Sequence, residues 1–152
     1  MDTEYYQSPA GVLEITADER ALVAVRFCAD NRSYVPSGNP VIRQAVAQLS
    51  EYFAGKRRTF DLPLYACGTA FQEKVWEALL HVPYGETLSY AELARAVRHP
   101  EACRAVGNAN GRNAIAIIIP CHRVIASDGT LGGYAYGPDR KKWLLDLEKR
   151  YK

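Results

Sequence analysis

Cys121 stands between a proline and a histidine in the run Pro120-Cys121-His122. A thiolate is a strong nucleophile, and a neighbouring base or positive charge raises the fraction of the thiol that is ionised. The six apolar residues 114–119 predict a buried strand that leads into this cysteine. Because adjacent strand residues point to opposite faces, His122 need not touch the thiol, and a water molecule could bridge the two. The histidine would then need an acidic partner, for which Glu148 is the candidate.

The other cysteines offer less chemistry. Cys28, Cys67 and Cys103 stand apart, none of the four cysteines forms a Cys-x-x-Cys pair, and the three histidines are scattered. A zinc site needs clustered ligands, so neither a metal nor another cofactor is predicted. A lone cysteine is usually buried and inert. The Pro-Cys-His-Arg run directly after an apolar strand favours a reactive Cys121 instead.

Three short helices are predicted ahead of the cysteine. The patterns Thr69-x-x-Gln72 and Ser89-x-x-Glu92 are capping boxes, which mark helix starts, and a third helix is predicted from 101 to 109. Two short helices joined by a tight turn fit helix-turn-helix geometry. The turn at 127–129 predicts a hairpin that could form the wing of a winged helix, and Pro138 opens a last helix.

The third helix allows two interpretations. It is built mainly from small residues: Ala102, Ala105, Gly107 and Ala109. Arg104 and Asn108 are the long or polar exceptions. Small residues with one arginine suit a close approach to a narrow surface such as the DNA minor groove. The alternative is a tightly packed core helix with one solvated arginine, and composition alone does not separate the two.

The first half of the chain is predicted to form a supporting domain of strands and one helix. Residues 11–16 and 21–27 flank a polar turn and predict an antiparallel hairpin, and a helix is predicted from Pro40 to Gly55. We therefore predict an N-terminal α/β support domain over residues 1–65. A second domain, which contains the three short helices and Cys121, is predicted over residues 66–152.

Composition and charge narrow the class of protein. The chain has 152 residues, of which 48% are hydrophobic and 24% charged, as in globular proteins. Residues 1–65 hold seven basic and eight acidic side chains, whereas residues 66–152 hold twelve and nine. The basic excess is too small to establish nucleic-acid binding by itself. No apolar run approaches the roughly 20 residues of a membrane span, and the polar N-terminus predicts no secretory signal. We expect a monomer without membrane contact, in the cytoplasm or in the nucleus of a eukaryote.

Residues from about 69 to 148 resemble the O6-alkylguanine-DNA alkyltransferases, also called methylated-DNA–protein-cysteine methyltransferases. The matching segments follow the family order and spacing: Phe71-Gln72, Val75-Trp76, Pro83-Tyr84-Gly85, Ser89-Tyr90, Arg104-Ala105-Val106-Gly107, Asn110-Gly111-Arg112-Asn113, Ile119-Pro120-Cys121-His122-Arg123-Val124-Ile125, Gly132-Gly133-Tyr134 and Lys142-Trp143-Leu144-Leu145. The Pro-Cys-His-Arg-Val core is the most specific of them. The first half is similar only in length and in its pattern of strands and one helix.

The resemblance implies an α+β fold and a single-turnover repair reaction. An N-terminal α/β lobe with a small antiparallel sheet, ribonuclease-H-like, would accompany a C-terminal helical lobe of winged helix-turn-helix type. The partner would be double-stranded DNA that contains O6-alkylguanine. After the protein binds the minor groove and flips the nucleotide, the alkyl group would move irreversibly to the protein. O4-alkylthymine is a possible second substrate.

The resemblance also implies residue roles at the reacting sulfur. Cys121 would be the nucleophile and alkyl acceptor, His122 would take its proton through a water molecule, and Glu148 would orient His122. Asn113 would brace the hinge before the cysteine. Tyr90 would hydrogen-bond the flipped base and protonate it as it leaves.

Further roles follow for DNA and base recognition. Arg104 would fill the space left by the flipped nucleotide, on a DNA-contacting surface shared with Ala102, Ala105 and Asn108. The backbone groups of Cys121, Val124 and Ala135 would read the guanine edge. The pocket would be lined by Tyr134 and by Tyr136.

Two residues depart from the family pattern. Ala114 replaces a proline that is common after the hinge asparagine, which predicts a less rigid segment. Tyr136 stands where many members have glycine, which puts bulk beside the base pocket.

Three other functions remain open at this point. A related module could mark alkylated DNA without accepting the group, although loss of the cysteine would be its signature. A winged-helix regulator would make the Cys-His-Glu set a coincidence. A cysteine hydrolase would turn over repeatedly on a small substrate.

Overall fold

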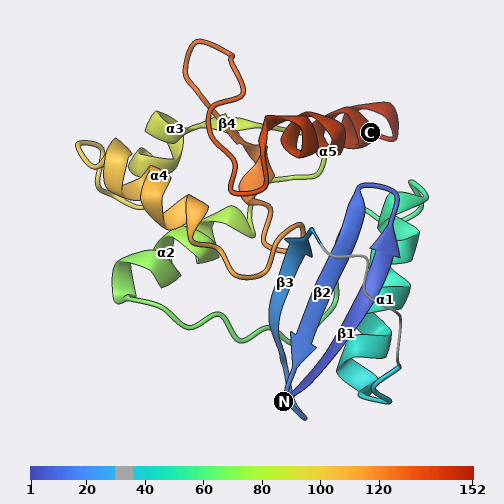
Figure 1. Cartoon of the computed structure of the whole chain (residues 1–152). Helices are drawn as coiled ribbons and strands as arrows, with labels where there is room; N and C mark the ends of the chain where they lie inside the picture. Colours follow the sequence, from blue (N-terminus) through green and yellow to red (C-terminus); the bar gives the residue numbers. More distant parts are fainter. Residues whose placement is uncertain (30–35) are drawn as a thin grey trace. The chain divides into compact units, whose positions relative to one another are not determined.

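The chain forms two compact units. A computed structural model describes residues 1–29 and 36–152. The first unit comprises Met1–Ala66 with Ala114–Ala116, and the second comprises Cys67–Asn113 with Ile117–Lys152. Figure 1 traces the order of their elements, which mix α and β structure as predicted. No helix in the described parts of the chain is long and apolar enough to cross a bilayer.

The first unit is a small antiparallel sheet with one helix. Its strands β1 (Asp2–Ser8), β2 (Gly11–Ala17) and β3 (Leu22–Cys28) lie in that order. The pairing of β2 with β3 confirms the predicted hairpin. The strand β1 was not predicted, because its sequence is polar and Glu4 is its one buried side chain.

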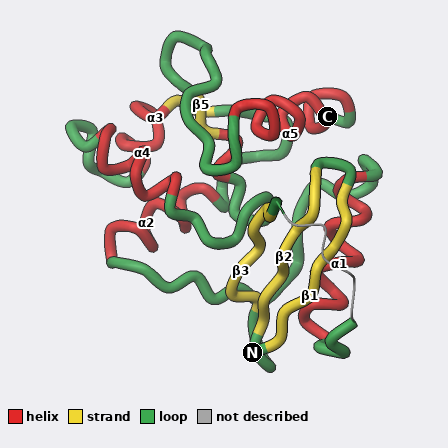
Figure 2. Tube along the Cα trace, viewed as in Figure 1, coloured by secondary structure: helices red, strands yellow, loops and turns green. Residues whose placement is uncertain are grey.

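The helix α1 (Pro40–Phe53) begins at the predicted Pro40 and ends two residues before Gly55, and it lies against one face of the sheet (Figures 1 and 2). The side chain of Asn39 accepts hydrogen bonds from the first free backbone N–H groups, and the chain leaves the helix through Gly55 at a φ of +78°. The apolar side of α1 covers the buried strand residues, and the two together form the core of this unit.

The second unit is mainly helical. Its elements in chain order are α2 (Ala70–Leu79), β4 (Leu88–Ser89), α3 (Tyr90–Ala96), α4 (Cys103–Gly111), the 3-10 turn η1 (Cys121–Arg123), β5 (Val124–Ile125) and α5 (Pro138–Arg150). Both predicted capping boxes are present, with Thr69 capping α2 and Ser89 capping α3. The third helix begins at Cys103, two residues later than predicted, and its N-cap Ala102 offers no side-chain hydrogen bond.

The predicted strand at 114–119 is wrong. Ile115 forms a single bridge with Val25, the next residues form a turn, and Ile117 adopts a φ of +72°. The segment is buried all the same, and side chains take over hydrogen bonds that a strand would give to its neighbour. Asn113 Nδ2 donates to the carbonyl of Ile119 at 2.8 Å. A continuous apolar run indicates burial, but it does not distinguish a strand from a buried loop.

The hairpin turn predicted after Cys121 is present but short: the Gly129 N–H donates to the carbonyl of Ala126 and the Ala126 N–H donates to the carbonyl of Thr130, without a pair of strands beyond them in the described sheets. Gly129 has a φ of +88° and closes a tight turn onto Ala126. The strand before this turn, β5, pairs in parallel with β4 rather than with a strand after the turn. Residues 131–134 therefore continue as a loop towards α5 (Figure 2).

Candidate active site

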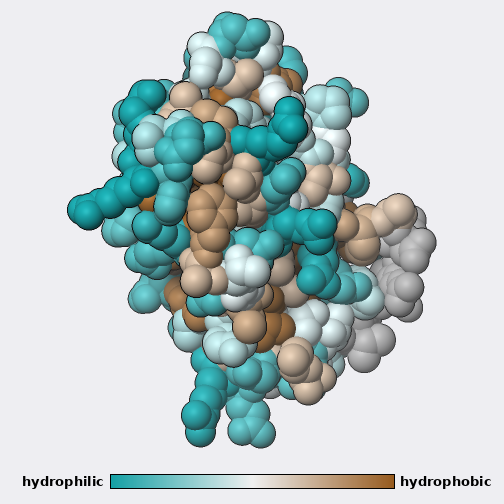
Figure 3. Space-filling model, turned by 90° about the vertical axis from the view of Figure 1, so that its left-hand side faces the viewer, coloured by the Kyte–Doolittle hydropathy of each residue, from teal (hydrophilic) through white to brown (hydrophobic). Residues whose placement is uncertain are grey.

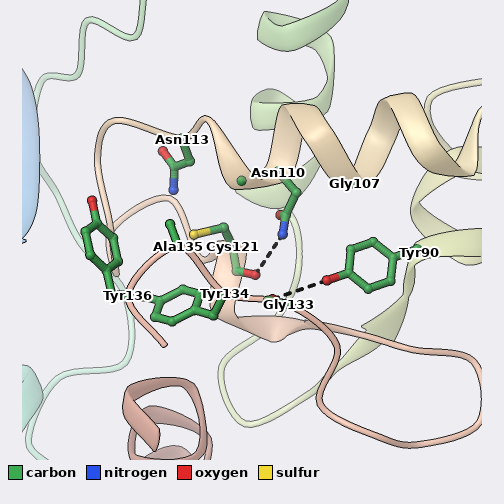
Figure 4. Close-up of a pocket in the computed structure, with 10 residues that line it drawn as sticks. Tyr90, Gly107, Asn110, Asn113, Cys121, Gly133, Tyr134, Ala135 and Tyr136 are labelled. Carbon is green, nitrogen blue, oxygen red and sulfur yellow. Dashed lines mark hydrogen bonds between the residues drawn. The ribbon is translucent and has the colours of Figure 1, made fainter. Parts of the chain in front are cut away.

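A cavity of about 260 Å³ opens in the second unit beside Cys121. Its lining comes from α3, α4, the link to η1 and the glycine-rich loop before α5 (Figure 4). The lining residues are Tyr90, Gly107, Asn110, Gly111, Asn113, Cys121, Gly133, Tyr134, Ala135 and Tyr136. Five of the predicted site residues other than Cys121 thus meet at one cavity: Asn113, Tyr90, Tyr134, Ala135 and Tyr136.

Cys121 lies in the turn η1, not at the end of a strand as predicted, and it is 5% exposed. Burial raises the pKa of its thiol, although a hydrogen bond from the Asn113 side chain and the charge of Lys141 act in the opposite direction. The amide nitrogen of Asn113 faces the sulfur in Figure 4. Burial therefore favours the protonated thiol over the thiolate in the resting site.

His122 and Glu148 form a fully buried pair behind the cysteine. His122 Nε2 lies 2.6 Å from Glu148 Oε2, which brings together the two residues that the sequence paired across 26 positions. Burial lowers the pKa of His122, against the pull of the Glu148 carboxylate. Burial disfavours ionisation of Glu148 as well, but the hydrogen bonds and charges of His122 and Arg123 outweigh it and hold its pKa well below the usual range. Both shifts favour a neutral imidazole beside an ionised carboxylate.

The other nitrogen of the ring is free. His122 Nδ1 is buried and has no hydrogen-bond partner among the described residues. An ionised carboxylate only accepts hydrogen bonds, so Nε2 must carry the proton of the neutral ring. The lone pair then lies on Nδ1, which is the atom able to take a proton.

Tyr90 begins α3, so its ring is fixed by the capped first turn of that helix. Its hydroxyl donates to the carbonyl of Gly133 at 3.4 Å, and burial raises the pKa of the phenol. Gly132 lies against the ring: a Cβ at this residue, whose φ is +72°, would come within 3.0 Å of the Tyr90 ring. The glycine there permits the close approach. Tyr90 is therefore a protonated phenol at the cavity wall.

The loop before α5 supplies the aromatic wall opposite. Tyr134 and Tyr136 meet edge to face, with ring centroids 5.6 Å apart, and in Figure 4 Tyr136 and Tyr90 lie on opposite sides of Cys121. The Tyr134 hydroxyl is buried without a hydrogen-bond partner in the described structure. Val124, also predicted for the pocket, does not line the cavity. Its side chain is fully buried and its carbonyl accepts a hydrogen bond from Lys141.

The predicted DNA-contacting residues lie on α4 and not in the cavity. Arg104, Ala105 and Asn108 are exposed, and Ala102 is half-buried at the start of the helix. The side of Figure 1 on which α2, α3 and α4 lie faces the viewer in Figure 3, where apolar patches interrupt the hydrophilic surface. An exposed Arg104 fits both interpretations of this helix, but Ala105 and Asn108 are exposed beside it, so this face of α4 is open to solvent and not packed in the core. It is a surface of small side chains with one long cation.

Three residues of the site carry no predicted role. Asn110 Nδ2 donates to the carbonyl of Cys121 at 3.2 Å, and Arg123 holds Glu148. Lys141 is fully buried on α5, donates to the carbonyls of Val124 and Gly133, and has a pKa that burial lowers to about 8. Asn110 and Arg123 stand inside motifs that the sequence singles out. The signal for Lys141 is its position two turns before Glu148, on the same helix face.

No metal site accompanies these residues. Within residues 1–29 and 36–152, no group of three or more His, Cys, Asp or Glu side chains is placed to hold a metal ion.

The chain is similar to known proteins over nearly its whole length. Residues 70–150 match the family described as 6-O-methylguanine DNA methyltransferase, DNA binding domain, and residues 1–66 match its ribonuclease-like domain. The methylated-DNA–protein-cysteine methyltransferase of Methanosarcina acetivorans is 47% identical over 148 residues, which cover 94% of this chain and 95% of that protein. Its namesake from Mycobacterium leprae is 48% identical over 93% of this chain and 88% of its own. A crystal structure of Mycobacterium tuberculosis OGT in complex with DNA superimposes with a TM-score of 0.88 at 45% identity, over 97% of this chain and 92% of that one.

Proposed function

The chain belongs to the 6-O-methylguanine DNA methyltransferase family, and from that membership we propose that it repairs DNA by moving the alkyl group of an O6-alkylguanine to its own Cys121. The observation that carries the assignment of the acceptor is the buried thiol at the cavity, with the 2.6 Å His122–Glu148 pair behind it. The transfer is a single-turnover reaction. Ordinary cellular thiols cannot reduce the thioether product, so Cys121 is not regenerated.

The target atom determines the first steps. An O6-alkyl group lies inside the duplex, so the nucleotide must leave the base stack before a buried sulfur can reach it. Unstacking costs a few kcal/mol, and a side chain inserted into the gap offsets part of this cost. We assign that role to Arg104, because it is the long cation on a helix surface of small residues that can approach a narrow groove. Ala102, Ala105 and Asn108 contact DNA on the same surface.

The sulfur of Cys121 then attacks the alkyl carbon, and each proton and electron pair of this step can be followed. The proton of the Cys121 thiol passes, through a bridging water, to Nδ1 of His122, which Glu148 keeps in the required tautomer. The sulfur lone pair forms the S–C bond while the C–O6 bond breaks and its electron pair stays on the guanine. Tyr90 gives its proton to the departing base, and the proton held by His122 returns to the phenolate through solvent. The products are neutral guanine and an S-alkylcysteine.

Other groups shape the cavity around the base. Asn113 holds the link before η1 through Ile119 and contacts the thiol, so it fixes the position of the sulfur. The backbone groups of Cys121 and Ala135, both of which line the cavity, read the guanine edge, and the ring of Tyr134 forms one wall. The domain predicted over residues 66–152 carries DNA binding and transfer, and the domain predicted over residues 1–65 serves as support. The site of action is where the chromosome lies, in the cytoplasm of a cell without a nucleus.

Transfer stoichiometry tests this function. A duplex with one radiolabelled O6-methylguanine, in excess over protein, should lose one methyl group per protein molecule and then stop reacting. Cys121→Ser should lose transfer but keep DNA affinity within a few-fold, because the DNA-contacting surface lies on α4. Cys67→Ser is the matched control, since this exposed cysteine lies outside the cavity and outside α4 and should be dispensable. Continued turnover beyond one equivalent would point to a hydrolase, and binding without transfer would point to a damage-marking module.

A further inference from the structure

Arg123 follows the reactive pair directly and is only 6% exposed. Its Nε donates to Glu148 Oε1 at 2.8 Å and its Nη2 donates to Oε2 at 3.1 Å, so guanidinium and carboxylate meet as a two-pronged pair. Its remaining terminal nitrogen, Nη1, donates to the carbonyl of Val82 at 2.7 Å, and the group lies over the ring of Tyr84. This planar fork fixes both the place and the plane of the carboxylate.

The carboxylate of Glu148 is saturated with donors. Oε1 accepts from Arg123 and from the backbone N–H of Gly85, while Oε2 accepts from Arg123 and lies 2.6 Å from His122 Nε2. Two carboxylate oxygens offer about four acceptor sites, so a protonated Glu148 would forfeit one of these bonds. The site is built around an ionised carboxylate.

The charge on Glu148 gives Arg123 a role that its neighbours do not share. An ionised carboxylate in a buried site needs a counter-charge, and Arg123 and His122 both contact it with groups that can be cationic. We propose that Arg123 is a positioning residue that supplies this counter-charge and so leaves His122 uncharged, with Nδ1 free to accept the proton of Cys121. The proposal rests on the proposed role of His122 as the base.

The other groups that act on His122 are consistent with this division. Burial and the charges of Arg123 and Lys141 lower the pKa of His122, and Glu148 alone raises it. Lys141 directs its ammonium to the carbonyls of Val124 and Gly133, so it does not neutralise the carboxylate by contact. Without the Arg123 charge, the His122–Glu148 pair would bind one more proton near neutral pH. That extra proton can reside on His122 or on Glu148, and in both cases Nδ1 loses its lone pair. A charged His122 carries a proton on each nitrogen, and a protonated Glu148 would donate to Nε2, so that the ring proton moves to Nδ1.

Two variants separate charge from packing. Arg123→Gln keeps amide donors beside Glu148 but removes the charge, whereas Arg123→Lys keeps the charge but removes the fork. The transfer rate constant of each is measured from pH 5 to 9, with thermal unfolding and DNA affinity as controls for folding. We expect Arg123→Gln to gain an acidic limb with its midpoint above the ordinary histidine value of about 6.5, so that its rate one pH unit below the midpoint is about tenfold lower than its plateau rate. Arg123→Lys should show no such limb, and Arg123→Gln/Glu148→Gln should lose the limb again at a lower plateau.

The wild-type protein supplies the second measurement. The ¹⁵N shifts of His122 should report a neutral ring with its proton on Nε2 at pH 7, and this result needs neither DNA nor a variant that folds. A charged ring, or a proton on Nδ1, would overturn the proposal even if methyl transfer is normal. An Arg123→Gln profile lowered equally at every pH would also overturn it, because that is the signature of lost packing. Failure of transfer in the wild type would count against the proposed function instead.

Discussion

Replacing Tyr136 by glycine should widen the choice of alkyl groups that the protein accepts. Tyr136 lines the cavity and is held edge to face against Tyr134, at a ring distance of 5.6 Å. The cavity of about 260 Å³ is slightly below the roughly 300 Å³ at which pockets begin to take drug-sized ligands. A purine with a methyl group fits such a space. A benzyl group must displace the Tyr136 ring.

The size of the effect follows from packing. Forcing extra carbon atoms into a tight site costs about 1–3 kcal/mol, which corresponds to roughly tenfold to hundredfold in rate. We therefore expect Tyr136→Gly to raise the second-order rate constant of Cys121 with free O6-benzylguanine by that factor. The rate with O6-methylguanine should change little. Loss of the ring pair removes about 0.5–1.5 kcal/mol of stability, which appears in the unfolding midpoint rather than in the benzyl-to-methyl ratio.

The assay follows the loss of reactive Cys121 by intact mass at several concentrations of each free base. Ala135→Gly is the matched control, because it loosens the same loop without removing bulk. A benzyl-to-methyl ratio that is unchanged or lower in Tyr136→Gly would refute the steric argument. It would mean that the ring points away from the alkyl group or stacks on it.

Three further outcomes test individual residues. Arg104→Ala should slow repair of duplex DNA far more than transfer from the free alkylated base, which needs no flipping; equal losses on both would assign Arg104 a structural role. Tyr90→Phe should slow transfer by about a hundredfold, which is the lower end of the contribution of a general acid. The unfolding midpoint should change little, because the hydrogen bond from the Tyr90 hydroxyl to Gly133 is long and partly exposed. An unchanged transfer rate would contradict the role of Tyr90 as proton donor. The pKa of His122 is lowered by folding, so the unfolded chain binds more protons below about pH 6.5 and stability should fall as pH drops through that value. Urea titrations of wild type and His122→Gln should show a shallower acid loss in the variant, and parallel curves would contradict the buried neutral imidazole.

Local signals predicted the helices well. The capping residues Thr69 and Ser89 and the helix-opening Pro40 and Pro138 act on the nearest backbone groups, so their effect can be read without knowledge of the fold. The resemblance to a known family then placed Cys121, His122 and Glu148 together. The structure adds the distance and the burial that make their chemistry possible.

Hydrogen bonds between backbone groups and side chains of other segments could not be predicted in the same way. The segment 114–119 reads as a strand, yet hydrogen bonds from Asn110 and Asn113 to the carbonyls of Cys121 and Ile119 support a buried turn instead. Buried charges escaped prediction for a related reason. Lys141 and Arg123 belong to residue types that are almost never buried unless paired, and their partners lie outside their own local segments, between eight and 41 residues away in the sequence.

The central claim is that Cys121 itself becomes alkylated, once per molecule, by damaged DNA. Incubation with a duplex that contains O6-methylguanine, followed by intact-protein mass measurement and peptide mapping, tests this most directly. The account predicts that every active molecule gains the mass of one methylene, located on the peptide that contains Cys121, while Cys121→Ser gains nothing. An unmodified protein beside demethylated DNA, or a methyl group on Cys28, Cys67 or Cys103, would contradict it.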